Sequence, residues 1–146
     1  MIPTFVTFEA DPPAAEIGAF DGSAPPPGRP LANALAHALV AAGLRVSGPP
    51  AESDSYGWAF EVEHDGAQIW CMLQRSDAWL LITEARRTLG DRLFGRSHEA
   101  AHRAVYEALN RALQAHPSIR DVRWYTRAAF DALATTGGGS GSRPDA

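Results

Sequence analysis

The segment YGWAFEVEHDGAQIWCML at positions 56–73 constrains the fold of this chain more than any other feature. Large apolar side chains alternate there with small and acidic ones, and Asp65-Gly66 favours a two-residue hairpin turn. Counting outward from the turn predicts these pairs: Val62 with Ile69, Phe60 with Cys71, Trp58 with Leu73, Glu61 with Trp70, and Ala59 with Met72. The segment therefore predicts an antiparallel hairpin with one apolar face and one mixed face.

Patterns on both sides of the hairpin predict the other elements. Alternation of apolar residues predicts strands, and apolar residues spaced three and four apart predict helices. The expected strands are 4–9, 44–47, 56–63, a partner strand that starts at 67, 79–84 and 120–125, and the expected helices are 30–42, 97–115 and a short last helix capped by Thr126. The order β-α-β-β-β-β-α-β-α predicts an α+β two-layer fold, in which an antiparallel sheet carries two main helices on one face.

The length of the chain, 146 residues, suits one domain. Residues 11–30 are dense in Pro and Gly, which predicts a long loop. Residues 135–146 are rich in Gly and Ser and predict a flexible tail. We therefore expect a single α+β domain over residues 1–134.

Cysteine content and the first residues bear on location. Cys71 is the only cysteine, so it has no internal disulfide partner, and the hairpin pattern directs it into the core. The first residues lack the basic and apolar regions of a signal peptide, and no apolar run is long enough to span a bilayer. These features predict a cytoplasmic protein with no membrane partner, and the net charge of −4 argues against general nucleic-acid binding.

The letters HEAAH at 98–102 match a zinc-binding pattern. On a helix, His98 and His102 lie one turn apart and can converge on one zinc ion, with Glu99 placed to activate a bound water. Both histidines also fall on the apolar stripe of the predicted helix, but no third ligand follows at a suitable spacing. The pattern is therefore open to two interpretations, a minimal zinc-dependent hydrolase or histidines that cap and pack the start of a helix.

Charge is unevenly distributed along the chain. The stretch from 52 to 65 contains carboxylates and no arginine: Glu52, Asp54, Glu61, Glu63 and Asp65. Together with Trp70 on the mixed face of the hairpin, this stretch predicts a surface for a basic partner. The segment 86–96 contains Arg86, Arg87, Arg92 and Arg96 shortly before a helix N-terminus, which suits an anion, although its glycine spacing matches no phosphate-binding loop.

Two segments carry a resemblance to a known group of proteins. ESDSYGWAFEVEHDGAQIWCMLQRSDAWLLI and the later SIRDVRWYT resemble small uncharacterised bacterial α+β proteins with an acidic loop, a (Y/W)-G-W-x-F strand, a hairpin and a Trp-containing strand. Proteins of this type resemble immunity proteins, which bind and neutralise a bacterial toxin. The resemblance implies a non-enzymatic protein-binding module without a cofactor, and the acidic face (Glu52, Asp54, Glu61, Glu63 and Trp70) is the expected binding surface. The alternative is the zinc hydrolase.

Overall fold

The computed structural model describes residues 2–10, 28–53, 57–75, 78–86 and 98–137. The elements are β1 (Phe5–Ala10), α1 (Arg29–Ala41), β2 (Arg45–Val46), β3 (Ala51–Ser53), β4 (Gly57–His64), β5 (Ala67–Arg75), β6 (Trp79–Arg86), α3 (Glu99–Ala115), β7 (Ile119–Tyr125) and α4 (Arg127–Gly137). This arrangement confirms the predicted α+β fold. It has one more strand than expected, because β3 lies in a segment that was predicted to be a loop and is too short to show an alternating pattern.

Most of the predicted loop and tail lie outside the described part of the chain. Residues 11–27 and 138–146 are not described, so the structure leaves those predictions untested. At their borders the helices extend slightly further than expected: α1 begins at Arg29, and α4 continues to Gly137 within the predicted tail. Among the described helices, none is long and apolar enough to cross a membrane.

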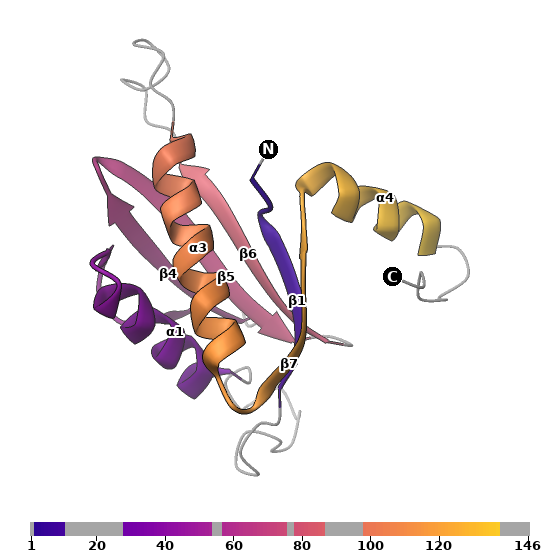
Figure 1. The fold of residues 1–146 in the computed structure, drawn as a ribbon, viewed down its shortest axis with the longest axis horizontal. Coiled ribbons are helices and arrows are strands. Elements are labelled where there is room, and N and C mark those ends of the chain that lie inside the picture. The colour runs from indigo at the N-terminus through magenta and orange to yellow at the C-terminus, as the bar shows by residue number, and fades with distance from the viewer. Residues whose placement is uncertain (1, 11–27, 54–56, 76–77, 87–97, 138–146) are drawn as a thin grey trace.

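All described strands belong to one antiparallel sheet. Its order is β2-β4-β5-β6-β1-β7, and β3 pairs with β4 further along the edge that β2 occupies. Figure 1 shows β1 between β6 and β7, so the first and the last described strands are neighbours in the sheet. This insertion joins the central hairpin to the C-terminal strand.

The central hairpin has the predicted register. The structure pairs Val62 with Ile69, Phe60 with Cys71 and Trp58 with Leu73. At the turn, Asp65 and Gly66 both have positive φ angles, 51° and 77°. Two positive φ angles in a two-residue turn match the right-handed twist of the paired strands, which explains why Asp-Gly sets this register.

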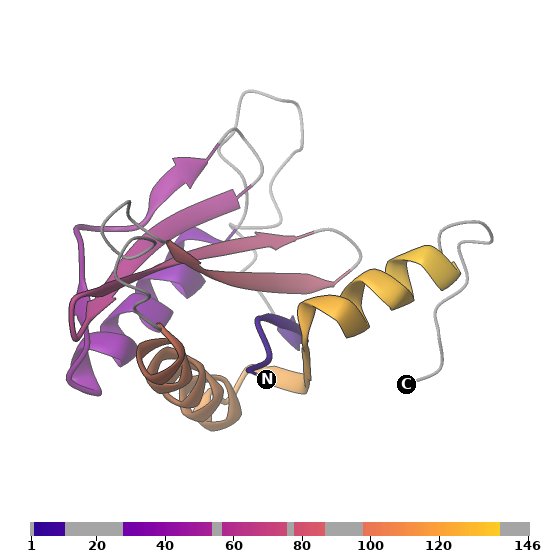
Figure 2. The ribbon, with the colours of Figure 1, turned by 90° about the horizontal axis from the view of Figure 1, so that it is seen from above.

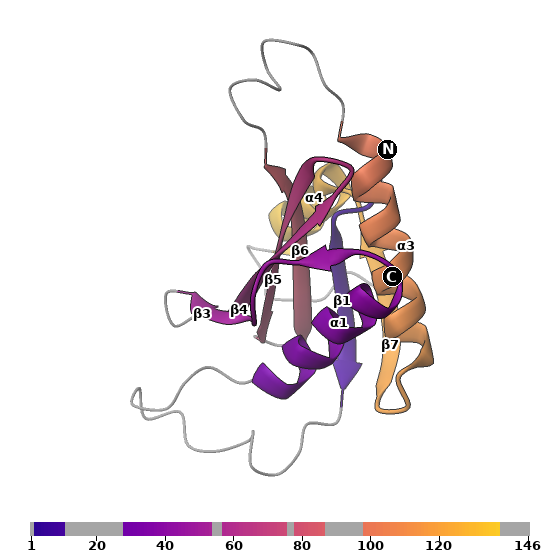
Figure 3. The ribbon, with the colours of Figure 1, turned by 90° about the vertical axis from the view of Figure 1, so that its left-hand side faces the viewer.

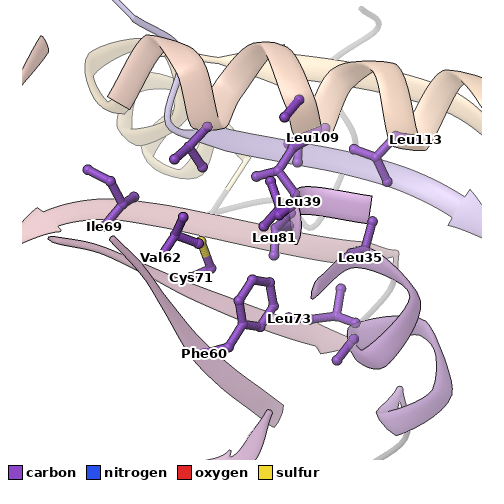
Figure 4. Packing of buried hydrophobic residues seen from close by; sticks show 14 of the residues in the cluster. Leu35, Leu39, Phe60, Val62, Ile69, Cys71, Leu73, Leu81, Leu109 and Leu113 are labelled. Carbon is purple, nitrogen blue, oxygen red and sulfur yellow. The ribbon is translucent and has the colours of Figure 1, made fainter. Parts of the chain in front are cut away.

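Helices α1 and α3 pack on one face of the sheet, as predicted (Figures 1 and 3). We call this the covered face and the opposite one the open face. Figure 4 shows side chains of β4, β5 and β6 pointing toward those of the two helices. The fully enclosed part of this core includes Val6, Leu39, Val62, Ile69, Cys71, Leu73, Leu81, Val105, Leu109 and Leu113. Burial of these apolar side chains is the main stabilising contribution to the fold.

Glycines define both ends of α1. Gly28 adopts φ 112° as the N-cap, and its lack of a side chain lets the ring of Trp79 pack against it. At the other end, Gly43 has φ 93°, its N–H donates to the carbonyl of Val40, and the N–H of Leu44 donates to that of Leu39. These bonds form a Schellman motif, which satisfies carbonyls that the helix end would leave unpaired.

Helix α3 starts slightly later than expected. Its N-cap is His98, with no side-chain capping bond, whereas the predicted cap Ser97 lies outside the described residues. The buried stripe consists of Ala101, His102, Val105, Ala108, Leu109 and Leu113. The stripe agrees with the helical spacing in the sequence, except that Ala112 is only partly buried.

The C-terminal strand and helix attach to the edge of the sheet. Strand β7 pairs with β1 through an irregular register beside Asp121, whose φ is 57°. The hydroxyl of Thr126 accepts a bond from the N–H of Ala129 at 3.2 Å, as expected of a helix cap. Figure 2 shows α4 extending away from the other helices.

Phe130 is the main contact of α4 with the sheet. Its ring stacks on Phe5 at 4.5 Å between centroids and meets Tyr125 edge-on at 6.1 Å. Phe130→Ala should destabilise α4 by about 1–2 kcal/mol, because it removes both ring contacts to Phe5 and Tyr125. Hydrogen exchange should then show faster exchange in α4 and unchanged exchange in β5. Equal acceleration of both elements would contradict this local role.

Candidate functional site

The open face carries a row of apolar side chains across the sheet. Ala59 pairs with Met72, Met72 with Ile82, and Ile82 with Phe5. Residues directly opposite each other in paired strands share a face, so these four lie side by side across β4, β5, β6 and β1. Met72 is buried and the others are half-buried. We call these residues the apolar row.

Beside the apolar row lies a row in which a tryptophan stands between two carboxylates. Glu61 pairs with Trp70, and Trp70 pairs with Glu84. From the end of β6, Arg86 reaches over this row: its Cζ lies 5.6 Å from the centre of the Trp70 ring, and its Nε lies 3.3 Å from Oε1 of Glu61. Arg86 therefore bridges β6 and β4 above the indole of β5.

The structure divides the predicted acidic surface between two faces. Glu61, Glu63 and Trp70 occur together on the open face, as the hairpin register requires. Glu52 pairs with Trp58, whose side chain belongs to the covered face, so Glu52 is directed to the opposite side of the sheet. Asp54 lies outside the described residues. The predicted surface is thus reduced to its hairpin part, because β3 sets the direction of Glu52.

The open face also carries arginines that the acidic stretch of sequence does not contain. Arg86 pairs with Glu61, and Arg45 on β2 stands opposite Glu63. Within the described residues, Glu63 and Glu84 have no ion-pair partner. The open face around Trp70 therefore carries both positive and negative charges, and two of its carboxylates, Glu63 and Glu84, can interact with other molecules.

His98 and His102 lie at the buried start of α3, as their place on the apolar stripe predicted. Oγ1 of Thr83 lies 2.9 Å from Nε2 of His102 and 3.3 Å from the carbonyl oxygen of Thr4. The hydroxyl and the imidazole therefore share a buried hydrogen bond, and the tautomer of His102 decides which of the two donates. Burial lowers the pKa of His102 below its ordinary value of 6.5.

Among the described residues, the surroundings of these histidines include no further metal ligands that complete a site. Glu99 is exposed, and one of its oxygens lies 3.5 Å from Arg103 in a pair on the outer side of the helix. No group of three or more ligand side chains occurs in the part of the chain that the structure describes. Nε2 of His102 is engaged in the hydrogen bond to Thr83, so a zinc ion at this nitrogen would have to displace that bond. The zinc site stays a prediction, with two buried histidines as its basis.

The arginine-rich segment and Cys71 are the other two candidates for chemistry in the sequence. Of the predicted anion-binding arginines, Arg86 is engaged on the open face, whereas Arg87, Arg92 and Arg96 lie outside the described residues. Cys71 is buried in the core, and burial and then the charge of Glu61 raise its pKa above the ordinary thiol range. A thiol with a raised pKa is a poor nucleophile, so Cys71 has a packing role.

Several residues of the open face were missed by the sequence analysis. The pairing of β6 with β5 brings Ile82 into the apolar row and places Glu84 and Arg86 beside Trp70. The pairing of β1 with β6 adds Phe5 to the apolar row. The alternation within 79–86 could have predicted that Ile82, Glu84 and Arg86 share a face. Their position beside Trp70 depends on a register that this segment does not encode.

Comparison of the chain with protein-family models, curated proteins and solved structures found no match.

Proposed function

We propose that this chain is a non-enzymatic protein-binding module whose partner docks on the open face of the sheet. The supporting observation is that Trp70 and Ile82 are half-buried on a face where the only described helix is α4, which covers the Phe5 end through the ring of Phe130. Apolar side chains bordered by charged ones are typical of interaction surfaces, and Trp, Phe and Met are enriched in them.

The edge strands of the sheet are poorly suited to pair with a strand of a partner, which favours docking on the open face. Strand β7, at one side of the described sheet, has exposed Arg120 and Arg123 and an irregularity at Asp121. On the other side β2 and β3 are short and cover β4. Charged, irregular and short edge strands discourage pairing with another chain.

The chemistry of the surface suits a basic partner. Glu63 and Glu84 are the carboxylates available to it, and Trp70 and Ile82 provide apolar contact area. A toxin neutralised by a cytoplasmic immunity protein is the partner that the resemblance of the hairpin and β7 segments implies. Neutralisation by masking a basic surface needs no catalytic residue in this chain.

Charge reversal tests the proposal. Glu61→Lys together with Glu63→Lys should weaken capture of the partner from native cells by about tenfold or more, since like charges then meet across the interface. The fold should tolerate both changes, because exposed ion pairs contribute about 1 kcal/mol or less. Capture is measured with tagged variants under native expression, followed by neutralisation of the captured protein's activity.

The matched control makes the same charge change on the covered side. Glu52→Lys with Glu107→Lys adds the same positive charge at exposed positions of β3 and α3. This variant should keep the partner. Capture that survives reversal on the open face, or that is lost equally in the control, would contradict the proposed surface.

A further inference from the structure

We propose that Trp70, Glu61 and Glu84 form a seat for an arginine side chain of the partner, and that Arg86 of this chain occupies the seat in the partner's absence. We call these three residues the guanidinium seat. The inference deepens the proposed function, on which it rests, by naming the group that the open face recognises.

The first support is the geometry of the seat. Glu61 and Glu84 flank Trp70 directly in register, one on each neighbouring strand. A cation on the exposed side of the indole thus has a carboxylate on both sides and the electron-rich ring face below it. This is the environment that favours a cation over an aromatic ring.

The second support is that the surface already holds a guanidinium group. Arg86 places its Cζ 5.6 Å from the Trp70 ring centre and its Nε 3.3 Å from Glu61. Because a guanidinium is planar, it can stack on an indole and still donate to a carboxylate at its edge, which a lysine ammonium does less well. The occupant seen here identifies arginine as the matching chemistry.

Arg86 is held loosely enough to be exchanged. Its side chain is 53% exposed and that of Glu61 is 34% exposed, so solvent screens their pair. Glu84 has no ion-pair partner among the described residues, so one side of the seat is unsatisfied while Arg86 is in place. A partner arginine that reaches Glu84 as well as Trp70 gains a contact that Arg86 does not make.

The test uses a capped glycine peptide with one central arginine, and its lysine counterpart, titrated into the full chain. Binding is followed by NMR through the indole N–H signal of Trp70, assigned with Trp70→Leu. The arginine peptide should shift this signal more than the lysine peptide does. Arg86→Gln should tighten binding about threefold to tenfold, since the internal competitor is lost.

Two matched variants separate the seat from general charge attraction. Arg45→Gln removes the same charge from the same face but not from the seat, and should leave affinity near that of the wild type. Glu84→Gln should weaken binding more than Glu63→Gln, because Glu63 stands opposite Gln68 rather than Trp70. Equal effects within either pair, or no response of Trp70 to the arginine peptide, would overturn the proposal.

The two proposals fail in different ways. If Glu61→Lys with Glu63→Lys abolishes partner capture while the Trp70 signal ignores the peptide, the open face binds a partner and the seat is wrong. If the peptide binds as expected and capture survives charge reversal, these residues bind a guanidinium group, but the partner docks elsewhere and does not use them.

Discussion

Gly57→Ala is expected to destabilise the fold by about 3 kcal/mol, because the new methyl group would collide with the backbone. A Cβ at Gly57 would meet the carbonyl oxygen of Leu73 in β5, and it would also lie 3.1 Å from Cα of Gln74. Backbone atoms of two paired strands cannot rotate away as a side chain would. Urea denaturation should show a lower midpoint with an unchanged slope.

Gly48→Ala is the control for this prediction. Gly48 has φ 73°, but a Cβ there meets nothing within 4 Å, so its cost comes from backbone strain alone. That cost should be about 1 kcal/mol. A Gly57→Ala variant no less stable than Gly48→Ala would mean that β4 can move away from β5 without loss.

Local patterns account for the parts of the fold that were predicted well. The hairpin register follows from Asp65-Gly66 and the alternation around it, since both are contained within one short segment. Strand β3 was missed because three residues do not show a period, and it forms only where β4 offers a partner. The insertion of β1 between β6 and β7 was equally beyond local patterns.

The candidate site shows the same division. Alternation correctly placed Glu61 and Trp70 on one face, because they are neighbours within the hairpin. Assigning Glu52 to the same surface required the register of β3, and placing Arg86 over Trp70 required that of β6. A stretch of carboxylates in sequence therefore predicted an acidic face, whereas distant strands determined which charges meet there.

His102→Ala is expected to lower the free energy of unfolding by about 3 kcal/mol at pH 7.5, through a cavity and the loss of the buried hydrogen bond to Thr83. His102 is 8% exposed, and its bond to Thr83 ties the first turn of α3 to β6. Thr83 in turn bonds Thr4 beside β1, so the loss reaches two strands. Thermal or urea denaturation measures the effect, and His37→Ala on the exposed side of α1 should cost little.

The stability of the wild-type protein should also depend on pH through His102. Burial lowers the folded-state pKa of His102 below the ordinary 6.5, so the unfolded chain takes up a proton at a higher pH than the folded one. The part of the free energy of unfolding that depends on neutral His102 is therefore fully present above pH 6.5. It is lost as pH falls below 6.5 toward the folded-state pKa.

A variant that can still hydrogen-bond Thr83 but does not ionise isolates the effect of His102 protonation on stability. His102→Gln should lose less stability between pH 7 and pH 5 than the wild type does, because an amide N–H can still donate to Thr83 but takes up no proton. His37→Gln should follow the wild-type pH profile, since His37 is exposed. If His102→Gln keeps the full wild-type profile, the acid sensitivity originates elsewhere, and the lowered pKa of His102 has no measurable consequence for folding.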